Sequence, residues 1–168
     1  QQQRISHEQM MAEIAVVFKG MSTQNLQTFA TQFYADIGEQ WLNLDLFSYV
    51  VDHQECEHRI VLLSETIQPL AECYRTFVGA QDVFGTRLEE IHGVLTGQIS
   101  HLMRAQEKKR LAQMYANKHH ICLQDSFAYG DDEADLPLFK TVGHPIIVRP
   151  HHGNFLQVIQ RNNWELIE

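Results

Sequence analysis

The most constraining feature of this sequence is a short apolar run that breaks into a dense acidic segment in the last third of the chain. Residues 126–129 read Ser-Phe-Ala-Tyr, which is typical of a short buried strand, and Gly130 then precedes four acidic residues within five positions. Asp131 and Asp135 can converge in front of the strand end, where a hard cation such as Mg²⁺ would relieve their repulsion. The pattern predicts either a metal site or a solvated loop whose aspartates cap the next helix.

Length and charge narrow the classes of protein to which the chain can belong. Its 168 residues, 44% of them hydrophobic, are enough for one globular domain with a real core. The formal net charge of −8, without a basic run longer than residues 108–110, argues against a nucleic-acid partner. No apolar stretch approaches the roughly 20 residues that are needed to cross a bilayer. We therefore expect a cytoplasmic protein that binds neither nucleic acid nor membrane.

Apolar residues at helical spacing predict three helices before residue 55. A capping box formed by Ser6 and Gln9 begins the first helix. The second helix is predicted from Ser22 to just before Gly38, and a third helical stretch covers about 44–51. The first two would form a helical hairpin.

After residue 55, short aliphatic runs alternate with helical stretches. The predicted strands are 59–63, 82–86, 126–129, 146–148 and 164–166, with a hairpin at 93–97. The predicted helices are one that has Pro69 in its first turn and ends at Gly79, one at about 103–118, and one at 155–161. This alternation predicts an α/β fold, a Rossmann-like parallel sheet whose apolar strands are covered by helices on both faces.

Two polar positions follow strands of this predicted sheet. Ser64 comes directly after the strand at 59–63, and Asp131 follows the strand at 126–129. Ligands of parallel α/β folds gather at the carboxyl ends of the strands. A hydroxyl group together with a metal-binding carboxylate suits an anionic oxygen ligand, so this edge of the sheet is a candidate phosphate site.

Several motifs together resemble one known family over residues 4 to the end. They read Ile-Val-Leu-Leu-Ser at 60–64, Phe-Gly-Thr-Arg-Leu at 84–88, Gly-Val-Leu-Thr-Gly at 93–97, Tyr-Gly-Asp-Asp-Glu-Ala-Asp-Leu-Pro-Leu at 129–138, Val-Gly-His-Pro at 142–145 and Val-Arg-Pro at 148–150. This set resembles the phosphoserine-phosphatase-like branch of the haloacid dehalogenase superfamily. The resemblance implies a haloacid dehalogenase-like α/β core at 55–168 that lacks its first strand, and a small helical cap at 1–54.

The resemblance also assigns roles to particular residues. Ser64 matches the residue that hydrogen-bonds the substrate phosphate, and Lys108 best fits the spacing of the lysine that neutralises it, with Lys109 close behind. Asp131 matches the Mg²⁺-binding aspartate, and Asp135 matches the second acidic position that supports the metal. Asp132 departs from the serine or threonine that is more usual at its position.

The motif that starts the family's chemistry is absent from these 168 residues. The family's first strand ends in Asp-x-Asp-x-Thr/Ser, whose first aspartate attacks phosphorus and whose second acts as acid and base. Asp45 is the nearest substitute, but it follows the expected cap helices, so using it as nucleophile would break the family's order. Either the strand lies in an upstream segment of a longer protein, or this member has no nucleophile. Loss of a segment is favoured because a parallel sheet without its central strand exposes unpaired edges.

The resemblance implies a Mg²⁺-dependent phosphomonoester hydrolase that acts through an aspartyl-phosphate. Its substrate would be phosphoserine or another small phosphomonoester, and its cofactor Mg²⁺. The 168-residue chain by itself is expected to be almost inactive, because removing a covalent nucleophile commonly costs on the order of 10⁴ to 10⁶ in rate. The alternative is a non-catalytic phosphate-binding or regulatory domain. Oligomeric state is not predicted.

Overall fold

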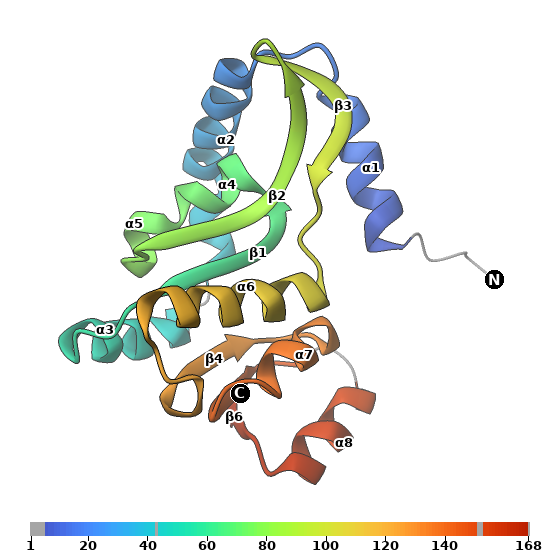
Figure 1. Ribbon diagram of the computed structural model, residues 1–168. Coiled ribbons are helices and arrows are strands. Elements are labelled where there is room, and N and C mark those ends of the chain that lie inside the picture. The colour runs from blue at the N-terminus through green and yellow to red at the C-terminus, as the bar shows by residue number, and fades with distance from the viewer. Residues whose placement is uncertain (1–5, 43, 151–152, 168) are drawn as a thin grey trace. The chain divides into compact units, whose positions relative to one another are not determined.

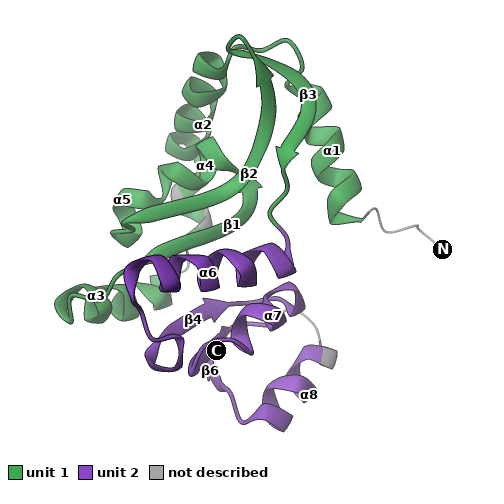
Figure 2. Cartoon of the chain, in the orientation of Figure 1, with its two compact units in different colours: residues 1–103 green, residues 104–168 purple. Residues whose placement is uncertain are grey.

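The chain divides into two units at the junction between Met103 and Arg104 (Figure 2). The computed structural model describes residues 6–42, 44–150 and 153–167. Each unit contains a three-stranded sheet with helices beside it (Figure 1). None of the described helices has both the length and the apolar character that a membrane span requires.

The helices of unit 1 form largely where the sequence predicts them. They are α1 (His7–Val17), α2 (Thr23–Ile37), η1 (Gly38–Trp41), η2 (Leu44–Leu46), α3 (Phe47–Glu55), α4 (Gln68–Cys73) and α5 (Arg75–Val78). The predicted capping box is confirmed, because the backbone N–H of Gln9 donates to Ser6 Oγ at 3.2 Å and the N–H of Ser6 donates to Gln9 Oε1 at 3.0 Å. Ser22 caps α2 in a similar way by accepting from the N–H of Asn25.

The sheet of unit 1 combines a parallel and an antiparallel pair. Its strands are β1 (Val61–Ile67), β2 (Asp82–Ile91) and β3 (Val94–His101), in that order across the sheet. β1 runs parallel to β2, and β2 continues well past its predicted end at residue 86 to form a hairpin with β3. The prediction that the first strand is buried on both faces is wrong: six of the seven residues of β1 are only half-buried. β1 is an edge strand of the described sheet, so no further strand of that sheet pairs with its outer side.

The ladder between β1 and β2 is interrupted next to Ser64. Pairing is regular up to Leu63 and Phe84 and resumes only at Ile67 and Thr86. The side-chain amide of Gln68 occupies part of this gap: its Nε2 donates to the carbonyl of Val83 at 2.9 Å, and its Oε1 accepts from the N–H of Gly85 at 2.6 Å. A side chain thus supplies hydrogen bonds that a continuous strand would otherwise make.

Unit 1 has a core that joins its first two helices to its sheet. Met11 of α1, Leu26 of α2, Ile67 of β1 and Leu95 of β3 form one buried cluster. These contacts place residues 1–54 in the same unit as the sheet, and the structure draws its boundary after Met103. The predicted division into a cap at 1–54 and a core at 55–168 stays a prediction.

Unit 2 is built around a parallel sheet. Its elements are α6 (Ala105–His119), η3 (Leu123–Asp125), β4 (Phe127–Gly130), η4 (Glu133–Asp135), α7 (Leu136–Phe139), β5 (His144–Val148), α8 (Gly153–Asn162) and β6 (Glu165–Ile167). The strands run parallel in the order β4, β5, β6. The central strand β5 is buried from Pro145 to Val148, and Phe139 and Phe155 pack with centroids 6.4 Å apart. The predicted α/β class with parallel strands is confirmed.

Candidate active site

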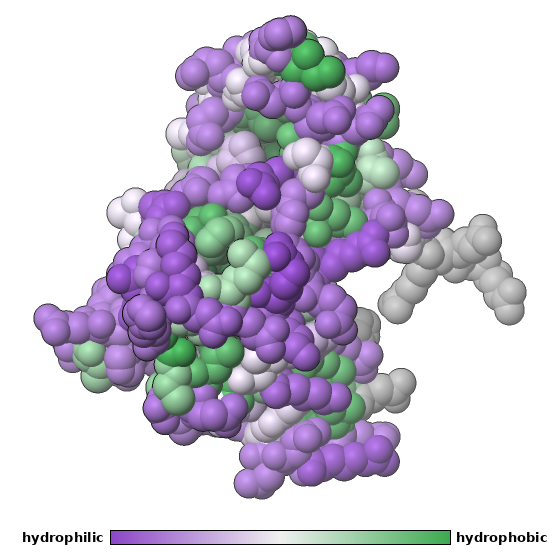
Figure 3. All heavy atoms as spheres, in the orientation of Figure 1, coloured by the Kyte–Doolittle hydropathy of each residue, from purple (hydrophilic) through white to green (hydrophobic). Residues whose placement is uncertain are grey.

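A buried lysine is the central feature of the site in unit 2. The inward face of α6 carries Lys108, Tyr115 and Ala116, at the seven- and eight-residue spacing of one helix face. Much of the surface visible in Figure 3 is hydrophilic, whereas only 8% of the surface of this lysine is exposed. Lys108 Nζ lies 2.7 Å from Asp135 Oδ1, and 7% of Asp135 is exposed. Because burying either charge alone is costly, each stabilises the charged form of the other.

The loop after β4 turns Asp135 inward and leaves its acidic neighbours outside. Asp132 begins η4 and its Oδ1 accepts from the N–H of Ala134 at 2.8 Å, while its carbonyl accepts from the N–H of Asp135 at 3.0 Å. Asp131 and Glu133 are exposed. The capping interpretation therefore has a counterpart, because Asp132 caps the turn of η4. Asp135 belongs to a buried ion pair, and the metal site stays a prediction.

Gly130 has a steric role that the sequence analysis missed. A Cβ at this position would lie 2.5 Å from Asp135 Oδ2 and 3.0 Å from the ring of Phe139. A side chain at the end of β4 would therefore displace the carboxylate that holds Lys108. The pattern Tyr-Gly-Asp was a usable signal, since a glycine inside a strand often marks a close approach of another group.

We predict that Gly130→Ala destabilises the chain by about 1–3 kcal/mol, because overpacking forces buried neighbours to shift. Denaturant unfolding measures this change in the free energy of unfolding. The matched comparison is the same substitution in an Asp135→Ala background, where the clashing carboxylate is gone and the cost should fall. If Gly130→Ala lowered the free energy of unfolding by the same amount in both backgrounds, this account of Gly130 would be contradicted.

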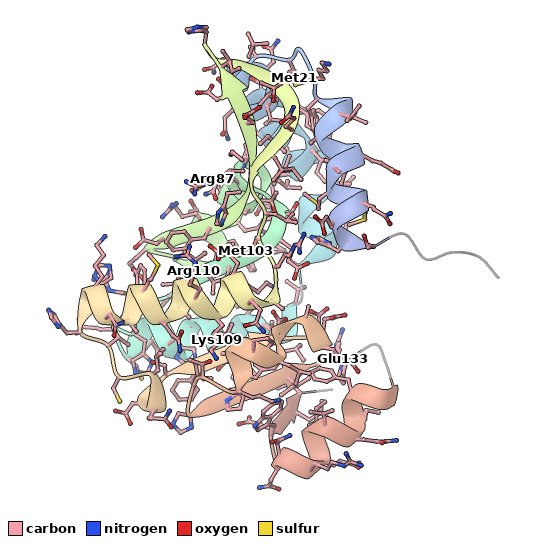
Figure 4. The ribbon with its side chains drawn as sticks, turned by 45° about the vertical axis from the view of Figure 1, so that its right-hand side comes forward. Met21, Arg87, Met103, Lys109, Arg110 and Glu133 are labelled. Carbon is pink, nitrogen blue, oxygen red and sulfur yellow. The ribbon has the colours of Figure 1, made fainter. Side chains whose placement is uncertain are left out.

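The other predicted lysine lies differently on α6. Lys109 is half-buried, whereas Lys118, in the last turn of the helix, is exposed. Figure 4 shows Lys109 and Arg110 on α6 and Glu133 on the segment between β4 and α7. Arg110 forms an ion pair with Glu107 on the helix surface, with 2.7 Å between Arg110 Nε and Glu107 Oε2. Of the two candidate lysines, Lys108 is therefore the one that the structure brings to an acidic site residue.

Asp131 offers an oxygen donor of the kind that Mg²⁺ binds. Asp131 follows the last residue of β4 and presents an exposed carboxylate at the carboxyl end of the strand. Mg²⁺ is commonly bound through one or two carboxylates, with water and phosphate oxygens completing the shell. Within the described ranges, no three or more His, Cys, Asp or Glu residues are grouped closely enough to hold a metal ion by themselves. Asp135 Oδ1 is engaged by Lys108, and Asp131 stays a predicted Mg²⁺ ligand.

The remaining predicted site residue belongs to unit 1. Ser64 lies within β1, one residue past the regular ladder, and is half-buried. Its Oγ accepts from the N–H of Thr66 at 3.3 Å. The structure therefore brings Lys108 and Asp135 into contact and places Asp131 on the adjoining loop, while Ser64 is described within its own unit. The side chain of Asp45, the rejected nucleophile candidate, lies outside the described residues.

The sequence matches one family model and is similar to several curated proteins. The sequence model of the haloacid dehalogenase-like hydrolase family matches residues 3–140. An "Inhibition of morphological differentiation protein" from Streptomyces azureus is 22% identical over 166 residues, which cover 96% of this chain and 58% of that protein. A "Probable phosphatase" from Mycobacterium tuberculosis is 20% identical over 146 residues, covering 87% of this chain and 51% of that protein. The chain thus spans little more than half the length of these curated relatives.

Solved structures share the fold at low sequence identity. A protein of unknown function from Bordetella pertussis matches with a TM-score of 0.85 and 21% identity, covering 98% of this chain and 75% of that chain. A probable phosphoserine phosphatase from Vibrio cholerae matches with a TM-score of 0.70 and 17% identity, covering 94% of this chain and 46% of that chain. Both likenesses concern the fold.

Proposed function

The chain belongs to the haloacid dehalogenase-like hydrolase family, and we propose that the protein of which it forms part is a Mg²⁺-dependent phosphomonoester hydrolase. The observation that carries the proposal is the buried ion pair between Lys108 and Asp135, which lies beside Asp131 on the loop after β4. A lysine kept charged at the carboxyl end of a parallel strand is suited to binding an anionic ligand there. The similarity to a protein named as a phosphatase supports the same class of reaction.

The proposed reaction proceeds through an aspartyl-phosphate. A carboxylate oxygen attacks phosphorus, the ester oxygen leaves with a proton from an acidic group, and water then hydrolyses the acyl phosphate. Lys108 and Ser64 would bind and orient the phosphoryl oxygens. Asp131, supported by Asp135, would hold Mg²⁺, which when bound supplies neutralisation of the phosphoryl charge.

We further propose that the nucleophilic aspartate lies on a strand outside these 168 residues. Three observations support this. The sequence contains no Asp-x-Asp-x-Thr/Ser motif, and the curated relatives are longer than this chain. In addition, β1 and β4 are both edge strands within the described sheets, so each has an unpaired side that could accept a further strand. We name the longer protein that would carry this strand the parent protein.

The substrate that we propose is a small phosphomonoester such as phosphoserine. The likeness to a structure named as a probable phosphoserine phosphatase supports this choice only through the shared fold. Residues 1–54 would then act as the cap that covers the site and selects the substrate. A cytoplasmic location stays a prediction.

Intact mass and phosphate release, measured on the protein isolated from its source cells, test the proposal together. We expect a mass well above the 19.5 kDa of this chain, and release of phosphate that requires Mg²⁺ and stops when the metal is chelated. The matched comparison is the 168-residue chain, for which we expect turnover lower by at least about 10⁴-fold. A natural protein of 19.5 kDa that releases no phosphate would instead support the non-catalytic phosphate-binding alternative.

A further inference from the structure

Two histidines meet at the carboxyl end of α3, in a part of unit 1 that the proposed phosphatase chemistry does not use. The Nδ1 atoms of His53 and His58 lie 2.8 Å apart, and their ring centroids lie 5.1 Å apart. His53 is half-buried and His58 is exposed. At this separation one Nδ1 donates its hydrogen and the other accepts it, so at least one of the two rings is neutral.

Backbone hydrogen bonds at the end of α3 hold the two rings together. The N–H of Glu57 donates to the carbonyl of Gln54 at 3.0 Å, and the N–H of His58 donates to the carbonyl of His53 at 2.9 Å. Glu57 has a φ of 55°, so the helix ends in a Schellman motif. This motif usually brings two apolar side chains into contact across the end of the helix. Here both positions are imidazoles, and the two rings already lie close together without a ligand.

We propose that His53 and His58 form a bidentate site for a divalent transition metal that favours tetragonal geometry, Ni²⁺ or Cu²⁺. Imidazole nitrogens bind such metals at about 2.0 Å, so two ligands at a right angle lie about 2.8 Å apart. A tetrahedral angle would separate the same two atoms by about 3.3 Å. The distance of 2.8 Å between the Nδ1 atoms of His53 and His58 is close to the value for a right angle, and tetragonal nitrogen and oxygen sites are typical of Cu²⁺ and Ni²⁺.

Binding requires a change of tautomer and a small rotation of the rings. With the hydrogen of each ring on Nε2, both Nδ1 lone pairs are available, and rotation about the Cβ–Cγ bonds aims them at one point. Water would fill the remaining coordination positions, since no third His, Cys, Asp or Glu is grouped with this pair among the described residues. The site is therefore distinct in ligand type from the carboxylate site at Asp131.

The local charges favour a neutral His53 and a nearby cation. Burial, followed by the neighbouring His58, lowers the pKa of the His53 ring. The carboxylate of Asp52 has the opposite effect on that pKa, because its negative charge favours a cation beside it.

Calorimetric titration of the tag-free 168-residue chain with Ni²⁺, which is not reduced by thiols, tests the proposal. We expect one Ni²⁺ per chain at the tightest site, and an affinity at least tenfold weaker in His53→Gln and in His58→Gln. Tenfold excess Mg²⁺ should not compete, because Mg²⁺ prefers oxygen ligands. Circular dichroism checks that each variant stays folded, and His58→Gln leaves the backbone bonds of the Schellman motif intact.

The matched control is His92→Asn, which removes another exposed histidine from the turn between β2 and β3. His92 has a φ of 51° and precedes Gly93, so asparagine suits the position. Ni²⁺ affinity should be unchanged in this variant. Equal Ni²⁺ affinity in the wild type and in His58→Gln would overturn the proposal. So would a loss of Ni²⁺ affinity in His92→Asn as large as the loss in His58→Gln. The result is independent of phosphatase activity, so failure of one proposal leaves the other standing.

Discussion

Lys108→Met is expected to lower the free energy of unfolding by about 3–5 kcal/mol, because it leaves the Asp135 carboxylate buried without its partner. Methionine fills nearly the same space as the lysine stem, so packing on the inner face of α6 should change little. The loss therefore arises from the orphaned charge. Urea unfolding, followed by circular dichroism, measures it directly.

Lys109→Met is the matched control, since it removes the same charge one residue further along α6 from a half-buried position. We expect this control to change stability by less than about 0.5 kcal/mol, as is usual for surface substitutions. The double variant Lys108→Met with Asp135→Leu removes both charges and should recover most of the lost stability. Equal effects at Lys108 and Lys109 would refute the assignment of Lys108 as the buried member of the pair.

Asp131→Asn in the parent protein is expected to reduce Mg²⁺-dependent turnover by more than about 100-fold. Changing a residue that only orients a metal ligand already lowers metal affinity or activity 10- to 100-fold. Asp131 is the proposed ligand itself, so its loss should have a larger effect. The substitution keeps the size of the side chain but removes the negative charge that a hard cation requires. The initial rate of phosphate release, measured over a range of Mg²⁺ concentrations, gives both turnover and metal affinity.

Glu133→Gln is the control for this second experiment. Glu133 is exposed, lies two residues from Asp131 on the same loop, and loses the same charge. Its turnover should stay within about twofold of the wild type if the effect at Asp131 reflects metal binding and not the general field of the acidic loop. Full activity in Asp131→Asn would remove Asp131 from the metal site.

Much of the secondary structure could be predicted because its signals are local. The side chains of Ser6 and Ser22 cap the first two helices within three residues of their own positions, so each helix start is encoded nearby. The parallel strands β4 and β5 are predicted by short apolar runs. β5 is buried from Pro145 to Val148, whereas the expectation that the run at 126–129 is a buried strand is wrong, because only Ala128 of β4 is buried. Prediction was poorer for β1 and β2, because the burial and the length of a strand depend on distant partners.

The sequence by itself determined the α/β class, the order of the elements and the position of Asp131 directly after a strand, since these follow from periodicity and spacing along the chain. Only the tertiary structure decided which acidic residue is turned inward and which lysine meets it. The contact between Lys108 and Asp135 joins residues 27 positions apart. Neighbouring residues on a helix point in directions about 100° apart. The choice between Lys108 and Lys109 therefore depends on how α6 is rotated against the loop after β4, and packing within unit 2 fixes that rotation.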